Sequence, residues 1–187
     1  MKPISHPLRR TAAGVLASVG LIASGCSGGE EQPEPSAPIA VGAAAPAWSG
    51  EDVRGHRVDL PGRGPVLLAF LHPTAESGSA RLAAARSSAV VVRSMATQYG
   101  GRGLRAVIAD AAEHAGYRED LLNLSYDWHL DGVLLLAPEP GASAADSYGA
   151  GPEPSTYLIG PDGTVRQRWV GTLSAQAVGP AVRQVVT

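Results

Sequence analysis

The segment that most constrains the fold is an unbroken apolar run that stops at a histidine and a proline. The run covers residues 66–71, and His72-Pro73 follow it. Such a run, with a valine and an aromatic in it, is typical of a strand buried on both faces of a sheet. Beyond the turn, apolar residues recur at spacings of three and four, at Leu82, Ala85, Ala89, Val92, Met95 and Tyr99. This spacing predicts a helix with one buried face, so the unit is a strand, a tight turn and a long helix.

The following residues predict a second unit of the same kind. Residues 104–109 form another apolar run, and Asp110 with Glu113 match a capping box that opens a helix through about Leu124. Strand, helix, strand and helix in this order imply parallel strands with right-handed crossovers. Two short elements are predicted next, a strand over 133–136 and one or two helical turns over 142–148.

An antiparallel hairpin is predicted on each side of this block. Residues 48–60, with a turn glycine at Gly55, predict a short N-terminal hairpin. Residues 155–170 predict a second hairpin, because two alternating strands flank a Pro-Asp-Gly turn. An apolar-patterned helix over 173–186 ends the chain, and we expect Gly179-Pro180 to kink or delay it.

These elements, in this order, resemble the thioredoxin-like redoxins of the TlpA type, in the superfamily of the AhpC/TSA redoxins. In that family the central strand leads into an aromatic, a few turn residues and a Cys-x-x-Cys motif. Counted from Phe70, the two cysteine positions fall on Ala75 and Gly78, so neither sulfur is present. The resemblance covers residues 42–186. It implies an α/β thioredoxin-like fold: a central mixed sheet with helices on both faces, an N-terminal β-hairpin and a TlpA-type strand-helix insertion.

The resemblance also gives a position to Pro154. Redoxins place a cis-proline directly before this strand, facing the Cys-x-x-Cys turn, where it exposes the preceding backbone to an extended partner peptide. We therefore expect a cis bond before Pro154, with Glu153 lining the peptide groove. The alternative is a trans-proline that only opens a strand, since trans is the commoner state of any proline.

Four polar residues of the turn are further candidates for binding in this groove: His72, Thr74, Glu76 and Ser77. We expect Glu76 in the first helical turn, where the helix dipole favours an acid, and Ser77 or Ser79 as the helix cap. A serine nucleophile would need an adjacent base, and the sequence has no Gly-x-Ser-x-Gly elbow. One histidine with one carboxylate is a poor metal site, so we predict no catalytic residue, no metal and no cofactor.

The N-terminus has the pattern of an export signal. Basic residues come first, an apolar segment over 12–23 follows, and Ser24-Gly25-Cys26 comes next. The apolar segment is too short for a membrane-spanning helix. Small residues before a cysteine resemble a bacterial lipobox, which implies removal of residues 1–25 and a diacylglycerol on Cys26. More than one acyl chain on this residue gives stable anchoring.

Two alternatives concern this segment. Ordinary cleavage near Ala23 or Gly25 would leave Cys26 as a free thiol, which is a liability in an exported protein. Arg9-Arg10 could also belong to a twin-arginine signal, but the surrounding residues fit that poorly and favour the general secretory route.

Residues 26–44 combine the lipidated cysteine with a segment rich in proline, glycine and acids, which predicts a flexible linker to a domain over 45–187. The formal net charge is −2 and the arginines are scattered, so the chain has no electrostatic footprint for nucleic acid. The expected partners are the membrane, through the lipid, and an extracytoplasmic protein or peptide.

Cys26 is the single cysteine of the chain, so the predicted domain contains no thiol. Disulfide exchange and peroxidatic chemistry both need a thiolate. We expect a non-catalytic binding or accessory module, lipid-anchored to the outer face of the cytoplasmic membrane in the cell envelope. The alternative is a redoxin-type thiol-disulfide or peroxide oxidoreductase that works with external thiols, and a third possibility is a spacer without a function at the groove.

Overall fold

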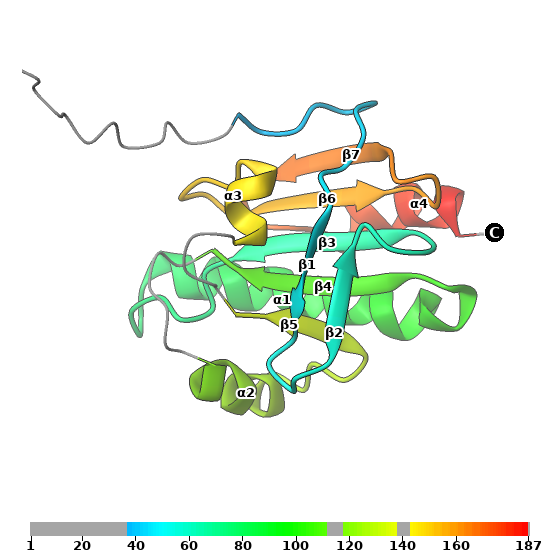
Figure 1. Cartoon of the computed structure of the whole chain (residues 1–187). Coiled ribbons are helices and arrows are strands. Elements are labelled where there is room, and N and C mark those ends of the chain that lie inside the picture. The colour runs from blue at the N-terminus through cyan, green and yellow to red at the C-terminus, as the bar shows by residue number, and fades with distance from the viewer. Residues whose placement is uncertain (1–36, 112–117, 138–142, 187) are drawn as a thin grey trace, which may run out of the picture. The chain divides into compact units, whose positions relative to one another are not determined.

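The computed structural model describes residues 37–111, 118–137 and 143–186 of the 187-residue chain. A five-stranded sheet in the order β5-β4-β3-β6-β7 forms the centre (Figure 1). Its strands are β3 (Val66–Leu71), β4 (Arg105–Asp110), β5 (Val133–Leu136), β6 (Ser155–Ile159) and β7 (Val165–Val170). The first three are parallel and the last two pair antiparallel, so the sheet is mixed.

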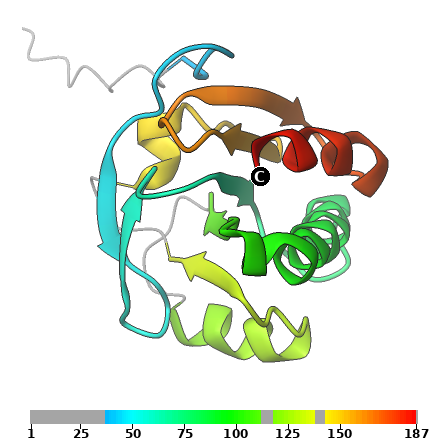
Figure 2. The same ribbon diagram turned by 90° about the vertical axis from the view of Figure 1, so that its right-hand side faces the viewer.

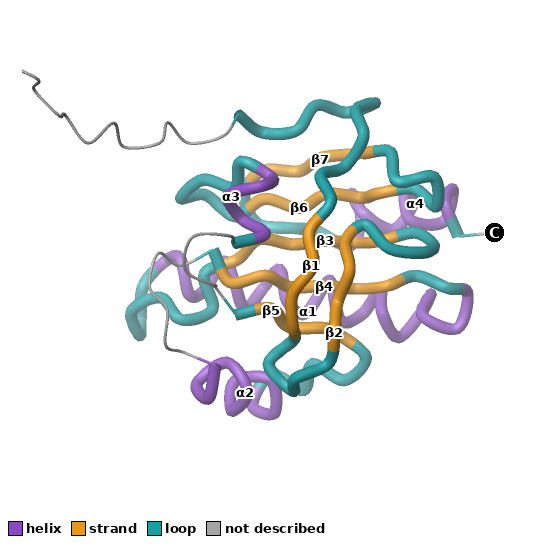
Figure 3. Tube along the Cα trace, viewed as in Figure 1, coloured by secondary structure: helices purple, strands orange, loops and turns teal. Residues whose placement is uncertain are grey.

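Helices lie on both faces of this sheet (Figure 2). One face carries α1 (Ala80–Tyr99) and α4 (Ala175–Val185), and the other carries α3 (Ala144–Tyr148) and the hairpin of β1 (Trp48–Glu51) and β2 (Arg57–Leu60). The remaining elements are η1 (Gly100–Arg102) and α2 (Arg118–Asp127) (Figure 3). This arrangement confirms the predicted α/β fold with its mixed sheet and N-terminal hairpin.

Strand β3 is central, and all six of its residues are buried. Leu67, Ala69 and Leu71 pack in one core cluster with α1 and α4, whereas Leu68 and Phe70 pack in another with the hairpin and α3. Since successive strand residues point to opposite faces, burial on both sides requires an unbroken apolar run. The strand predicted over 66–71 is confirmed.

Five of the six residues of the predicted face of α1 are buried: Ala85, Ala89, Val92, Met95 and Tyr99. The sixth, Leu82 in the first turn, is half-buried. The C-terminal helix α4 begins at Ala175, with Ser174 as its N-cap, and continues through Pro180. Pro180 therefore does not delay the start of this helix.

The N-terminal stretch contacts both edge strands of the sheet. At the hairpin turn, the N–H of Val53 donates to the carbonyl of Leu135 in β5 over 2.8 Å. Near the other edge, the N–H of Gly42 donates to the carbonyl of Val165 in β7 over 2.8 Å. The same stretch thus runs across the sheet from β7 to β5.

Candidate functional site

The candidate site lies where β3 and β4 end and β6 begins. Phe70 of β3 pairs with Ser155, the first residue of β6. Leu71 pairs with Asp110, the last residue of β4. In α/β sheets, ligands bind outside the carboxyl ends of the parallel strands, so this end of the sheet is where functional side chains are expected.

A turn over residues 72–79 connects β3 to α1. The N–H of Ala75 donates to the carbonyl of His72 over 3.1 Å, which keeps Ala75 close to the strand end. Gly78 has a φ of +79°, in the left-handed region that favours glycine. A cysteine at Gly78 would have open space around its Cβ but an unfavourable backbone. Both positions at which the resemblance expects a cysteine therefore lie in this turn.

Ser79 is the N-cap of α1, because its Oγ accepts a hydrogen bond from the N–H of Leu82 over 3.1 Å. The expectation that Glu76 lies in the first helical turn is wrong, since α1 begins at Ala80 and has no acid there. Of the two candidate caps, Ser79 and not Ser77 bonds the helix N-terminus, so α1 begins after Glu76. Glu76 is an exposed residue of the turn.

Thr74 and Asp110 join the turn to β4. Thr74 Oγ1 donates to Asp110 Oδ2 over 2.8 Å, and Asp110 is almost completely buried. The capping-box interpretation assigned this carboxyl to a helix N-terminus. In the structure Asp110 is the last residue of β4 and binds the turn, while Glu113 lies outside the described residues.

His72 is buried at the start of the turn, with 8% of the residue exposed. It faces the backbone of Gly151 and Pro152, and its Nε2 has no hydrogen-bond partner. Burial lowers the pKa of His72 below the usual 6.5, and Arg81 lowers it further. Asp110 and the two backbone groups raise the pKa of His72, but by less than burial and Arg81 lower it. The imidazole is therefore neutral at pH 7.

The peptide bond before Pro154 is trans, so the expectation of a cis-proline here is wrong. Within the described residues, Leu60-Pro61 holds the one cis bond. Trans is the lower-energy state of an X-Pro bond. Pro154 opens β6, and its carbonyl accepts a hydrogen bond from the N–H of Gly171 over 2.7 Å.

Three aromatic rings position the loop that leads into β6. The ring of Tyr148 lies 5.5 Å from that of Phe70 and 5.6 Å from that of Tyr157, centroid to centroid. The Tyr157 hydroxyl donates to the carbonyl of Tyr148 over 3.1 Å. Because Tyr148 ends α3, these contacts hold the start of the loop over residues 149–154 against β3 and β6.

Two of the predicted candidates on the turn contact neighbouring elements. His72 faces the loop before Pro154. Thr74 binds Asp110 at the end of β4. Three other candidates are exposed on the turn and the loop: Glu76, Ser77 and Glu153. Cys26 lies outside the described residues.

Sequence reasoning missed Ser155. This residue is 2% exposed, and its Oγ has no hydrogen-bond partner. A polar residue at the start of a predicted buried strand was the signal, because buried polar groups normally have partners.

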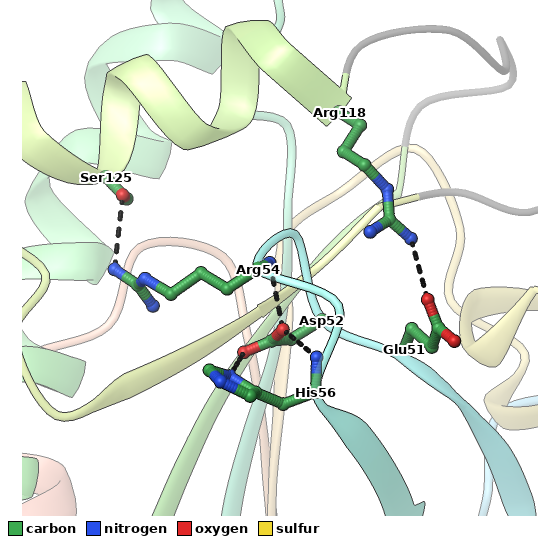
Figure 4. Close-up of polar contacts among 6 residues, drawn as sticks. All are labelled: Glu51, Asp52, Arg54, His56, Arg118 and Ser125. Atoms are coloured by element: carbon green, nitrogen blue, oxygen red, sulfur yellow. Dashed lines mark hydrogen bonds and ion pairs between the residues drawn. The ribbon is translucent and has the colours of Figure 1, made fainter.

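A second polar cluster lies at the hairpin turn (Figure 4). The buried carboxylate of Asp52 accepts hydrogen bonds from the N–H groups of Arg54 and His56 over 2.9 and 2.8 Å. The Nδ1 of His56 lies 3.2 Å from the same carboxylate. Two further contacts join the hairpin to α2: Arg54 to Ser125 at 3.4 Å and Glu51 to Arg118 at 3.6 Å. The Asp52 hydrogen bonds order the hairpin turn, and the other two contacts connect it to α2.

Over residues 37–111, 118–137 and 143–186, no three histidine, cysteine, aspartate or glutamate side chains are grouped so that they could hold a metal ion. In the same ranges, no helix has both the length and the apolar composition to cross a membrane.

The strand order, the mixed sheet and the flanking helices define a thioredoxin-like fold, and solved structures with this fold match the chain. One is the Chlorobium tepidum protein described as thiol:disulfide interchange protein DsbE, with a TM-score of 0.63 and 19% identity, covering 80% of this chain and 99% of that one. No family model and no curated protein matches the chain.

Two further structures extend the comparison. A peroxiredoxin-like protein from Aquifex aeolicus has a TM-score of 0.63 at 11% identity, covering 81% of this chain and 91% of that one. The exposed lipoprotein thioredoxin of Streptococcus pneumoniae has a TM-score of 0.55 at 16% identity, covering 74% of this chain and 99% of that one. At these identities the likeness establishes the fold.

Proposed function

We propose that this chain is a lipid-anchored, extracytoplasmic thioredoxin-like protein of the TlpA type that has lost the Cys-x-x-Cys pair. It binds a protein or an extended peptide in the groove between the turn at 72–79 and the loop at 149–154. It carries out no thiol chemistry of its own.

One observation carries this proposal: the chain has the fold of thiol enzymes, but the folded domain contains no cysteine. Its relatives in structure include a protein described as a thiol:disulfide interchange protein and a peroxiredoxin-like protein. The one cysteine of this chain is Cys26, which precedes the first strand by 22 positions, from 26 to 48. Disulfide exchange proceeds through a thiolate and a mixed disulfide, so the sheet and its turn have no group to perform it.

Polar groups at this end of the sheet support a binding role. The turn and the loop before β6 lie at the end of the central strand, and each presents exposed polar side chains. Two buried polar atoms of the same region, His72 Nε2 and Ser155 Oγ, have no hydrogen-bond partner. Such atoms are costly unless something else bonds them.

The N-terminal sequence supports the anchor. A basic start, an apolar segment over 12–23 and small residues before Cys26 fit a lipoprotein signal. A structural relative is described as an exposed lipoprotein thioredoxin, so a lipoprotein with this fold is known in that protein.

Turnover by the full chain separates this proposal from its enzymatic alternative. The wild-type chain and its Cys26→Ser variant are given a disulfide or a peroxide together with an external thiol. We expect no turnover above the rate without protein. Turnover that survives in Cys26→Ser would establish the redoxin-enzyme alternative and overturn the proposal.

Site-specific photo-crosslinking in intact cells tests the groove. A photoreactive residue replaces Ser77 or Glu153 in the full chain, and a matched control places it at Arg166, in β7 beside the far end of β6. We expect crosslinked partners from the groove positions and none from the control. Equal crosslinking at all three positions would place the contact elsewhere.

Detergent phase partitioning tests the lipid anchor. We expect the wild-type chain to enter the detergent phase and the Cys26→Ser variant to stay in the aqueous phase.

A further inference from the structure

A cavity of about 450 Å³ lies between β6, β7 and α4. Figure 2 shows α4, in red, beside these two strands. The cavity is lined by Leu158 near the end of β6, whereas the candidate site described above lies at the start of that strand. A cavity of this volume can hold a small molecule. The two sites are therefore separate, at opposite ends of β6.

Aliphatic side chains form one part of the lining, at Leu158, Ala181 and Val185. Leu158 is completely buried, and the other two are partly buried against the same core cluster. Carbon atoms of Ala181 and Val185 that remain in contact with water would be covered by a ligand with an apolar body. Removal of such surface from water favours binding.

The polar side chains of the lining are Arg166, Gln167 and Gln184. Among the described residues, no acid lines this cavity. Arginine has only donors, and each glutamine amide offers two N–H donors and one acceptor oxygen. Donors therefore outnumber acceptors in the lining, and the complementary group of a ligand is an acceptor.

Arg166 is held in place by the turn between β6 and β7. Its Nη2 donates to Asp162 Oδ2 over 2.6 Å, and Asp162 Oδ1 accepts from the N–H of Thr164 over 3.1 Å. A Cβ at Gly160 would lie 2.6 Å from Arg166 Nε, so the guanidinium packs against this turn. Since a guanidinium has five N–H donors, the bond to Asp162 leaves others for a ligand.

The charges of this part of the chain favour an anion. Residues 155–186 contain one acid, Asp162, and three arginines, so their net charge is +2, whereas that of the whole chain is −2. The C-terminal end of α4 carries a partial negative charge, which Arg183 in its last turn offsets. A net positive charge attracts an anionic ligand.

We propose that this cavity binds a small amphiphilic carboxylate, a molecule with a short apolar body and one carboxylate group. The apolar body covers Ala181 and Val185, and the carboxylate accepts hydrogen bonds from Arg166 and the glutamine amides. Charge-assisted bonds between a guanidinium and a carboxylate are stronger than those between neutral groups. This inference does not depend on the proposed binding of a protein or peptide at the other end of the sheet.

The test compares three probes with the same six-carbon chain: hexanoate, hexanamide and hexylamine. Each is titrated into the isotopically labelled full chain in detergent and followed by NMR, where the side-chain amide signals of Gln167 and Gln184 report binding in the cavity. We expect a Kd of about 1 mM for hexanoate, as for other ligands of so few atoms. Hexanamide should bind at least about fivefold more weakly, and hexylamine should leave both amide signals unchanged.

Two charge variants connect this preference to Arg166. Arg166→Gln should raise the Kd of hexanoate at least about fivefold and leave that of hexanamide within about twofold. Arg183→Gln is the matched control, because it removes the same charge from an exposed residue of α4 that does not line the cavity. It should change the Kd of hexanoate by less than about twofold.

Two volume variants connect binding to the cavity. Ala181→Leu adds three carbon atoms to the lining, so the shifts that hexanoate causes at both glutamine amides should be lost. Ala177→Leu, at an exposed position one turn earlier in α4, is its control and should leave the Kd of hexanoate unchanged.

Three results would each overturn this inference: hexanoate that shifts neither glutamine amide, equal binding of all three probes, or equal losses in Arg166→Gln and Arg183→Gln. None of them bears on the proposed function, which the crosslinks from Ser77 and Glu153 decide. Because the ligand is a small molecule, the crosslinking control at Arg166 is still expected to capture no protein.

Discussion

Thr74 Oγ1 lies 2.8 Å from Asp110 Oδ2 and donates a hydrogen bond to it across 36 residues of sequence. This bond attaches the turn after β3 to the end of β4. We expect Thr74→Val to lower the free energy of unfolding by about 1–2 kcal/mol, because the shape is kept and a buried carboxyl loses a donor. Urea unfolding monitored by circular dichroism measures this change.

Thr97→Val is the matched control for that substitution. Thr97 Oγ1 donates to the carbonyl of Arg93 within α1 at an exposed position. Its loss should change the unfolding free energy by less than about 0.5 kcal/mol. Equal losses in both variants would mean that the bond to Asp110 contributes nothing particular.

His72 should make stability depend on pH. Burial holds the pKa of His72 below its usual value of 6.5, so the unfolded chain binds this proton more readily than the folded one. The stability from the neutral ring is complete above pH 6.5 and declines as the pH falls towards the folded pKa. Relative to His72→Phe, wild type should therefore lose stability as the pH falls below about 6.5. Urea unfolding of both at several pH values measures this, and parallel curves would contradict it.

Asp52 predicts a dependence at lower pH. Burial alone would raise the pKa of Asp52, but hydrogen bonds from His56 and Arg54 outweigh it and hold the pKa below the usual 3.8. The stability from this carboxylate is present above pH 3.8 and is lost as the pH falls further. Asp52→Ala should cost about 1–3 kcal/mol at pH 7, because two backbone N–H groups lose their acceptor. The loss of unfolding free energy caused by Asp52→Ala should become smaller in acid. A loss that stays constant down to pH 3 would contradict the role given to the Asp52 carboxylate.

His129 offers a stabilising substitution. It ends α2 with a φ of +52°, and among the described residues it is the one non-glycine with positive φ. The N–H of Leu130 donates to the carbonyl of Ser125 over 2.9 Å, as in a helix end that normally uses glycine. His129→Gly should raise the unfolding free energy by about 0.5–1 kcal/mol.

The converse substitution is at Gly149, which ends α3 with a φ of +60°. Gly149→Ala should lower stability by about 1 kcal/mol, because a Cβ is unfavourable there. Thermal melts of the two variants should shift in opposite directions, and shifts of the same sign would contradict the helix-end explanation.

The central part of the fold could be predicted from the sequence because its signals are local. The run at 66–71 is apolar throughout since β3 is buried on both faces, and the turn glycine Gly55 has a φ of +83° between β1 and β2. The start of α1 could not be placed, because Ser77 and Ser79 are both suitable caps and only the folded turn decides which one bonds the helix.

Part of the geometry of the candidate site could be predicted. A turn and a strand start mark His72 and Pro154 in the sequence as candidates. The role of Asp110 depends on Thr74, a contact that no local pattern contains. Ser155 belongs to a strand whose partner is 85 residues earlier, from 70 to 155, so only the pairing shows that it lies near His72.

The N-terminal stretch, which crosses the sheet from β7 to β5, affects how copies of this protein interact at high concentration. Edge strands with bare backbone groups invite strand addition by a neighbour, which leads to aggregation. Val53 blocks part of one margin and Gly42 part of the other. Loss of the stretch before Val58 would expose backbone groups on both edge strands, so we expect it to favour strand addition between copies.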